Sequence, residues 1–148
     1  MKVAILMGSP RDDEKMAGAS EMLTRFGVEH EVHVMSAHRT PEEVAEFASN
    51  ARSNGFGVII CGAGMAAHLA GVVSAHTTIP VIGVPLSGGI SGGMDALLST
   101  VQMPRGIPVA TVAVDGSANA GVLAVEILSL RNGDLVAQLQ RFRDEGAR

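Results

Sequence analysis

The sequence predicts an α/β fold in a single domain: a three-layer, doubly wound parallel sheet with helices on both faces. Short apolar runs of strand length alternate along the chain with segments in which apolar residues recur every three or four positions. This alternation is typical of parallel sheets, whose consecutive strands are joined by helical crossovers. The second apolar run also alternates polar with apolar residues, which indicates the strand at the sheet edge.

Five runs are expected to form the strands. They cover residues 3–7, 29–35, 58–61, 81–84 and 109–113. The last three are almost wholly apolar, as is typical of central strands. The run at 29–35 instead places Glu29, Glu31 and His33 on one side, which suits an edge. A second strand at the edge favours the flavodoxin-like strand order 2-1-3-4-5 over the order 3-2-1-4-5-6.

Helices are expected between and after these strands. They are placed at about 16–26, 40–51, 66–76, 93–101, 119–130 and 134–144. The second has the clearest start, because Thr40 can cap it, Pro41 occupies the first helical position and Glu43 can close a capping box. The last is a C-terminal helix of the same domain, which is expected to span residues 1–148.

Composition excludes several classes of protein. The 148 residues suffice for one domain with a buried core. A formal net charge of −4 provides no basic field for a nucleic acid, so any phosphate binding must be local. No apolar run reaches the roughly 20 residues that span a membrane, and the apolar start is too short for a signal peptide. The single cysteine, Cys61, excludes an intramolecular disulfide and suits the reducing cytoplasm.

The balance of apolar and charged residues favours self-association. Mean hydropathy is +0.29, and charged residues make up 18% of the chain. The helices are rich in Ala, Met and Gly rather than in Lys and Glu. A small domain with so little charge to cover its surface is expected to bury part of it against copies of itself. A compact monomer with an apolar cleft is the alternative.

Three loops with polar side chains are expected to meet at one end of the sheet. In a doubly wound sheet, ligands bind outside the carboxyl ends of the strands, where the strand order reverses. For the order 2-1-3-4-5 this crevice lies between the first and third strands, beside the loop after the second. The three loops are 8–12, 36–40 and 62–68. The sequence therefore predicts a ligand site at this edge.

The first two loops suit a phosphorylated sugar. Loop 8–12 offers backbone amides, the Ser9 hydroxyl and a helix N-terminus, which together favour an anion. Arg39 precedes a helix and can hold a phosphate bidentately, or else form an ordinary surface ion pair. Asp12 can accept hydrogen bonds from a ribose diol, or else simply cap the helix.

His38 is the strongest candidate for proton transfer. An imidazole titrates near neutrality, so it can both donate and accept a proton. His38 also lies between a serine, a cation and a helix start. His68 follows a loop of small residues and is expected to face the same crevice, as a substrate contact or as a second proton carrier. His30, His33 and His76 have no such neighbours and are interpreted as surface or packing residues.

Motifs for other chemistries are absent or weak. Gly62-x-Gly64-x-x-Ala67 formally matches a dinucleotide fingerprint, but it follows the third expected strand, and no acidic residue lies about 20 positions later. The sequence contains no P-loop lysine motif, no Gly-x-Ser-x-Gly elbow and no metal-binding constellation. Cys61 ends a buried strand and is interpreted as a core residue. None of these chemistries is therefore predicted.

Two further loops have distinct expected positions. The glycine-rich loop 85–93 follows the fourth strand on the edge that carries the crevice, and we expect it to act as a mobile cover. Loop 102–108 enters the fifth strand from the opposite edge. It is therefore expected to lie far from the crevice of its own chain, although a neighbouring subunit can bring it close to another.

Together these segments resemble the 5-(carboxyamino)imidazole ribonucleotide mutase family of purine biosynthesis. The matching pieces are Met7-Gly8-Ser9 with Asp12 and Met16, Ser36-Ala37-His38-Arg39-Thr40-Pro41, Gly62-Ala63-Gly64 with Ala66-Ala67-His68-Leu69, Gly83-Val84-Pro85, Val101-Gln102-Met103-Pro104-Arg105-Gly106-Ile107-Pro108-Val109 and Ala118-Asn119-Ala120. They span nearly the whole chain in order. The resemblance implies a homo-octamer of flavodoxin-like subunits, with sites near subunit contacts and neither metal nor organic cofactor. It also implies a reaction in which a carboxylate moves from the exocyclic nitrogen of an aminoimidazole ribonucleotide to ring carbon 4.

The same resemblance implies roles for individual residues. His38 is the general acid/base. The substrate-binding residues are Ser9, Asp12 and Arg39 around the ribose phosphate, and Ser36, Ala37, Gly64, Ala66, His68 and Leu69 around the pocket. Arg11 stands where the family has a second serine, so a neutral phosphate contact is either replaced by a charged one or lost. Met65 and Ala70 replace the usual glycine and proline around His68, and the tail after Arg143 is shorter than in many relatives.

Two other functions fit part of the pattern. An aminoimidazole ribonucleotide carboxylase takes up carbon dioxide directly. Such relatives usually carry lysine after the Ser-Ala-His motif and a Ser-Asn pair in the third loop, so Arg39 and Ala66-Ala67-His68 favour the mutase. The other alternative is a non-enzymatic nucleotide-binding module on the same fold, in which His38 transfers no proton.

Overall fold

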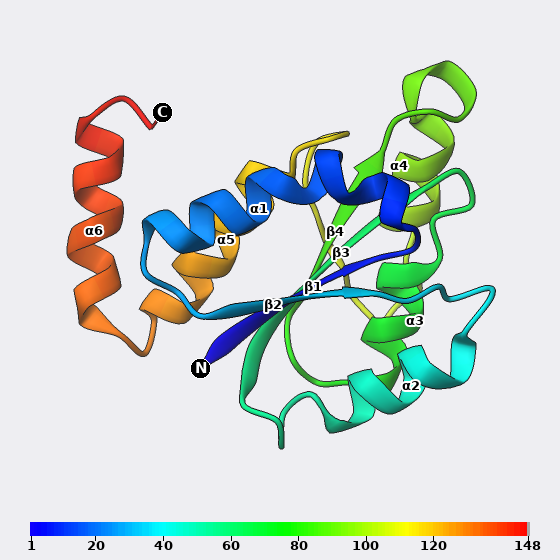
Figure 1. Ribbon diagram of the computed structural model, residues 1–148, viewed down its shortest axis with the longest axis horizontal. Coiled ribbons are helices and arrows are strands. Elements are labelled where there is room, and N and C mark those ends of the chain that lie inside the picture. Colours follow the sequence, from blue (N-terminus) through cyan, green and yellow to red (C-terminus); the bar gives the residue numbers. More distant parts are fainter. Residues whose placement is uncertain (148) are drawn as a thin grey trace.

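The computed structural model describes residues 1–147, which form a five-stranded parallel sheet between layers of helices (Figure 1). The strand order is β2-β1-β3-β4-β5. The strands are β1 (Lys2–Met7), β2 (His30–Val34), β3 (Phe56–Gly64), β4 (Val81–Leu86) and β5 (Ala110–Thr111). This arrangement confirms the predicted α/β fold and its strand order.

The helices cover the sheet from both sides. Within residues 1–147 they are α1 (Asp13–Arg25), α2 (Pro41–Asn50), α3 (Leu69–His76), α4 (Met94–Val101), α5 (Ser117–Ser129) and α6 (Gly133–Asp144), with short 3₁₀ turns η1 (Pro10–Asp12) and η2 (Ile90–Gly92). α1 and α5 pack on one face of the sheet and α2 and α3 on the other, while α4 packs against β4. α6 lies outside α5, away from the sheet (Figure 1). None of the helices described within residues 1–147 is both long and apolar enough to cross a membrane.

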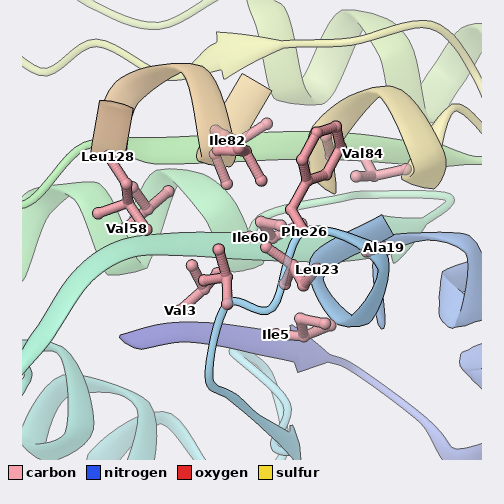
Figure 2. Close-up of a cluster of buried hydrophobic side chains, with 14 of the residues drawn as sticks. Val3, Ile5, Ala19, Leu23, Phe26, Val58, Ile60, Ile82, Val84 and Leu128 are labelled. Atoms are coloured by element: carbon pink, nitrogen blue, oxygen red, sulfur yellow. The ribbon is translucent and has the colours of Figure 1, made fainter. Parts of the chain in front are cut away.

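The pleat of each strand divides the core into two clusters. Val3, Ile5 and Met7 of β1 face α1 and α5, whereas Ala4 and Leu6 face α2 and α3. Figure 2 shows the first cluster, in which side chains of the sheet meet those of α1 and α5. The labelled residues are Val3, Ile5, Ala19, Leu23, Phe26, Val58, Ile60, Ile82, Val84 and Leu128. Complete burial of each large apolar side chain contributes about 1.5–3 kcal/mol to folding.

α1 and α5 approach each other closely because glycines lie in their contact. A Cβ atom on Gly121 of α5 would lie 2.9 Å from the Ala19 carbonyl oxygen and 2.8 Å from Met22 Cβ. On the facing helix, a Cβ atom on Gly18 would lie 3.1 Å from the Ala118 backbone nitrogen. This close packing fixes α1, and therefore the loop 8–12 before it, against the sheet.

The fifth strand is shorter than its sequence predicted, and it lies at the edge of the sheet. β5 pairs with β4 only through Ala110 and Thr111. The preceding Pro108 has no N–H to donate to a ladder, which limits a longer pairing. Val109 and Val112, on either side, pack individually against the two core clusters. The apolar character of 109–113 therefore reflects this packing, and the expectation of a central strand is wrong.

Candidate active site

A crevice lies at the carboxyl ends of β1, β2 and β3, where the three predicted loops meet. Its volume is about 320 Å³, within the range of roughly 300–1,000 Å³ that is typical of small-molecule sites. It is lined by Gly8, Ser9, Arg11, Asp12, Ser36, Ala37, His38, Arg39, Ala63, Gly64, Met65, Ala66, His68, Leu69, Ser87 and Gly88. Every residue that the sequence assigned to the site is in this set.

The structure adds lining residues that the sequence did not assign. Gly8, Ala63 and Met65 lie within or beside loops already predicted to form the site. Ser87 and Gly88 come from the glycine-rich loop after β4. Their place in the sequence could have predicted them, because this loop follows β4 at the edge of the sheet that carries the crevice.

A larger cavity of about 890 Å³ lies at the opposite end of the sheet. The end of α3, the start of β4 and residues 106–108 line it. Arg52, which also lines it, already donates to the Thr78 carbonyl oxygen at 3.2 Å and to the Thr78 hydroxyl at 3.0 Å. Residues 106–108 of loop 102–108 therefore lie at the end of the sheet opposite the crevice of their own chain, as predicted.

The turn that carries His38 is shaped by its own hydroxyls. Ser36 Oγ accepts hydrogen bonds from the backbone N–H groups of His38 and Arg39, both at 3.3 Å. Thr40 Oγ1 accepts from the Ser36 N–H at 3.0 Å. Because that hydroxyl is engaged within the turn, Thr40 makes no side-chain capping bond to α2, and the expected capping box is wrong. The turn nevertheless leads directly into Pro41, the first residue of α2.

His38 and His68 are hydrogen-bonded to each other across the crevice. His38 Nε2 lies 2.6 Å from His68 Nδ1, and the rings meet edge to face with centroids 4.7 Å apart. Both side chains are exposed. Such a contact needs a ring N–H on one side and a bare ring nitrogen on the other. The two imidazoles can therefore hold and exchange a proton at the crevice surface.

Arg39 connects the first two loops. Its Nη2 atom donates to the Gly8 carbonyl oxygen at 2.5 Å, which holds the guanidinium over loop 8–12. A guanidinium has five N–H donors, so this bond leaves others for an anion. Arg11, on the same loop, is exposed and adds a second cation to the crevice. The crevice is therefore locally basic although the whole chain is acidic.

Asp12 is the acidic residue of the crevice, and its surroundings favour its protonated form. Partial burial raises the pKa of this carboxyl above its ordinary value of 3.8, and this effect outweighs a backbone hydrogen bond at Ser9 and the charges of Lys15 and Arg39, which lower the pKa. Asp12 occupies the position before α1, yet its side chain makes no capping hydrogen bond to that helix. The interpretation of Asp12 as a simple helix cap is therefore wrong.

The third loop is compact because small residues follow one another. Met65 takes a left-handed backbone conformation, with φ of 55°, and its side chain is 67% exposed. Short backbone hydrogen bonds then join Ala67 N–H to the Met65 carbonyl and His68 N–H to the Ala66 carbonyl. α3 consequently begins at Leu69 rather than at the expected residue 66.

The remaining histidines and the cysteine lie outside the crevice. His30 contacts the Val28 carbonyl oxygen through Nδ1 at 3.1 Å, and His33 pairs with Glu31 and packs on Phe47. His76 lines the cavity at the opposite end of the sheet. Cys61 is fully buried, and burial raises the pKa of its thiol, as suits a core residue. Among residues 1–147, no three His, Cys, Asp or Glu side chains are grouped so that they could hold a metal ion.

The sequence matches known proteins along nearly its whole length. The family model described as AIR carboxylase matches residues 2–148. The chain is 52% identical over 147 residues to the "N5-carboxyaminoimidazole ribonucleotide mutase" of Vibrio vulnificus, covering 98% of this chain and 91% of that protein. It is 51% identical over 144 residues to the protein of the same name from Pyrococcus abyssi, covering 97% and 83%. It is also 49% identical to the "Phosphoribosylaminoimidazole carboxylase, chloroplastic" of Vigna aconitifolia, covering 97% of this chain and 26% of that protein.

A solved structure agrees with the sequence comparisons. The crystal structure of Treponema denticola PurE superposes on this chain with a TM-score of 0.89. The superposition covers 98% of this chain and 90% of that one, at 29% sequence identity. The fold is therefore shared over nearly the whole length of both chains.

Proposed function

The chain belongs to the AIR carboxylase family, and from this membership we propose that it is an isomerase of purine biosynthesis, an N5-carboxyaminoimidazole ribonucleotide mutase. Its reaction moves a carboxylate from the exocyclic nitrogen of 5-carboxyaminoimidazole ribonucleotide to ring carbon 4. The product is 4-carboxy-5-aminoimidazole ribonucleotide. The observation that carries the proposal is the identity of about one half, over nearly the whole chain, to relatives of this name.

The first step is loss of the carboxylate from nitrogen. His38 donates a proton to the carbamate nitrogen, the N–C bond breaks with its electron pair left on that nitrogen, and carbon dioxide and aminoimidazole ribonucleotide result. His38 lines the crevice and is hydrogen-bonded to His68. His68 can therefore return a proton to His38 or accept one from it, which gives the second ring a role as a proton carrier.

The second step forms the bond from ring carbon 4 to carbon dioxide. The electron-rich ring attacks carbon dioxide, and His38, now without its proton, removes the proton displaced from carbon 4. His38 gives one proton in the first step and takes one back in the second, so the reaction needs no other acid or base. Ala63, Gly64 and Ala66 bring the backbone of the third loop to the crevice surface, where small residues leave room for a planar ring. Confinement keeps carbon dioxide beside the ring, where proximity raises its effective concentration.

The ribose phosphate is held by the first loop and Arg39. Ser9, the N-terminus of α1 and the Arg39 guanidinium surround one end of the crevice. Arg11 takes the place of the family serine as a charged phosphate contact. Asp12 binds the ribose hydroxyls, since its side chain is not used to cap α1. Ser36, Ala37 and Leu69 complete the pocket around the base.

We also propose that residues 1–148 form one domain that assembles as a cytoplasmic homo-octamer. Exposed apolar side chains support the assembly. Ile90, Met94, Leu98 and Val101 form a stripe along η2 and α4 and are 73%, 49%, 50% and 46% exposed. Apolar stripes of this kind are typical of surfaces that are covered by another subunit.

Two parallel incubations test the function. The first follows synthetic 5-carboxyaminoimidazole ribonucleotide, and the second follows aminoimidazole ribonucleotide with bicarbonate, each corrected for the enzyme-free reaction. The mutase is expected to form the carbon-4 acid efficiently from the carbamate and poorly from aminoimidazole ribonucleotide at low bicarbonate. Equal or faster turnover in the second incubation would establish the carboxylase instead. Binding without turnover in either would establish a nucleotide-binding module.

A further inference from the structure

Lys15 of α1 joins three segments beside the crevice. Its Nζ atom donates to the Ser87 carbonyl oxygen at 2.6 Å and to Ser87 Oγ at 2.8 Å. Asp115, from the loop after β5, lies 4.0 Å from the same ammonium. Asp115 Oδ1 also accepts from the Ser87 N–H at 2.9 Å. One ammonium and one carboxylate thus engage the backbone and the hydroxyl of a single serine.

Asp115 takes a left-handed backbone conformation that a backbone hydrogen bond stabilises. Its φ is 56°, in a region that aspartate adopts more readily than most residues other than glycine and asparagine. Its N–H donates to the Pro85 carbonyl oxygen at 2.9 Å, which holds this conformation against β4. Burial raises the pKa of the Asp115 carboxyl, but the hydrogen bonds from Ser87 and the Lys15 charge outweigh it and lower that pKa. The carboxylate is therefore ionised at neutral pH.

The serine held in this way begins the glycine-rich loop and forms one wall of the crevice. Ser87 and Gly88 line the crevice together with His38 and His68. Within this loop the backbone takes left-handed conformations at Gly88, Gly92 and Gly93, with φ of 118°, 69° and 105°. Glycine backbones of this kind rotate easily, so the wall depends on side chains from other elements to fix it.

We propose that Lys15 is a positioning residue that fastens loop 87–93 to α1, so that Ser87 and Gly88 form the wall that retains carbon dioxide during the transfer. The proposal rests on the mutase function proposed above. Lys15 does not line the crevice, and it acts through Ser87. When the wall is loose, carbon dioxide released from the carbamate nitrogen leaves before ring carbon 4 attacks it. The product released is then aminoimidazole ribonucleotide, with the donated proton on its amino nitrogen.

The ratio of the two products measures this retention. Lys15→Met keeps the length of the side chain but removes its charge and donors. We expect the fraction of consumed carbamate that ends as aminoimidazole ribonucleotide to rise about threefold or more. Lys15→Arg, which keeps a charged donor, is expected to restore most of the parent ratio. Lys2→Met is the matched control, because Lys2 also forms an ion pair, with Glu31, but at the other end of the sheet. Once the enzyme-free loss of carbon dioxide is subtracted, the ratio does not depend on the amount of active enzyme, so a general loss of stability leaves the corrected ratio unchanged.

Hydrogen exchange tests the fastening without any substrate. Backbone amides of residues 87–93 are expected to exchange about tenfold faster in Lys15→Met than in the parent, with no change in Lys2→Met. Asp115→Asn, which keeps a side-chain acceptor and loses the charge, is expected to show an intermediate increase. Unchanged exchange in Lys15→Met overturns the proposal, as does a parental product ratio with accelerated exchange. Accelerated exchange in Lys15→Met, together with a parent chain that does not consume the carbamate, would instead refute the proposed function and leave the fastening intact.

Discussion

His38 Nε2 and His68 Nδ1 lie 2.6 Å apart, although the residues are 30 positions apart in sequence and follow different strands. The parallel sheet produces this meeting, because β2 and β3 flank β1 and both end at the same edge. While the bond exists, one ring donates and the other accepts, so at least one of the two imidazoles is neutral. A substrate that separates the rings frees a nitrogen of each for its own proton transfer.

His38→Asn is expected to abolish turnover while ribonucleotide binding largely survives. Asparagine keeps a polar group of similar size but transfers no proton at neutral pH, and loss of a general acid/base costs about 10²–10⁴-fold in rate. The measurement compares the kcat of carbamate conversion with the Kd of the product nucleotide for parent and variant.

His33→Asn is the matched control, because His33 pairs with Glu31 and packs on Phe47, outside the crevice. Its kcat is expected to stay within about twofold of the parent. A parental kcat for His38→Asn would contradict the assignment of His38 as the acid/base.

Arg39→Met is expected to weaken binding of a ribonucleotide monophosphate about 10- to 100-fold. A charge-assisted hydrogen bond contributes about 1.5–3 kcal/mol, and the Gly8 carbonyl oxygen also loses its donor. Titration calorimetry with the monophosphate and with the unphosphorylated nucleoside separates the two effects, because only the former pairs with the guanidinium. Arg52→Met removes a cation from the opposite end of the sheet as a control. Equal affinity of the parent and Arg39→Met for the monophosphate would exclude the phosphate role.

The sequence predicted the elements that bring the site together, because their signals are local. The apolar runs that became β1 to β4 and the helical repeats between them were sufficient to predict the strand order. That order placed loops 8–12, 36–40 and 62–68 at one edge, and the residues expected there line one crevice. Position in the topology, rather than any single motif, therefore predicted this crevice.

Contacts between distant side chains could not be predicted from local signals. The bond of His38 to His68 and the engagement of Ser87 by Lys15 depend on where loops from different strands end in space. The capping role expected of Thr40 was wrong because its hydroxyl instead accepts a hydrogen bond from the Ser36 N–H. Competition among hydrogen-bond partners of this kind is decided by the folded geometry.

Asp12→Asn is expected to stabilise the free protein at neutral pH while weakening ribonucleotide binding. Because the pKa of Asp12 is raised above 3.8 in the folded state, the folded state holds the proton more tightly than the unfolded chain. The contribution of Asp12 to the free energy of unfolding therefore falls as pH rises from 3.8 through the folded pKa, and this loss is complete above the folded pKa. In denaturant titrations, the free energy of unfolding of Asp12→Asn is expected to exceed that of the parent at about pH 7, and by less at about pH 4. A higher free energy of unfolding for the parent than for Asp12→Asn at neutral pH would contradict a raised pKa of Asp12 in the folded state.

Met65→Gly is expected to raise the free energy of unfolding by about 0.5–1 kcal/mol. Met65 adopts φ of 55°, which favours glycine, and its exposed side chain contributes little packing. The strain of about 1–2 kcal/mol that glycine relieves is partly offset by the greater freedom of glycine in the unfolded chain. Met65→Ala keeps the Cβ atom and therefore most of the strain, so it serves as the control. Denaturant midpoints of parent, glycine and alanine variants, measured together, separate loss of the side chain from relief of the backbone.

Gly121→Ala and Gly133→Ala are expected to change stability in opposite directions, although both place alanine in a helix. At Gly121 the new Cβ atom would lie 2.9 Å from the Ala19 carbonyl oxygen, a backbone atom that cannot turn away. α5 must then move off α1, at a cost of about 1–3 kcal/mol that exceeds the helix propensity gained. At Gly133, the first residue of α6, no atom lies within 4 Å of the new Cβ, so a gain of about 0.4–1 kcal/mol remains, because alanine is less free than glycine in the unfolded chain. Because α1 begins beside Asp12, Gly121→Ala is also expected to raise the KM for the carbamate, whereas Gly133→Ala leaves it unchanged. Equal stability of the two variants in denaturant titrations would show that the α1–α5 contact is looser than its geometry indicates.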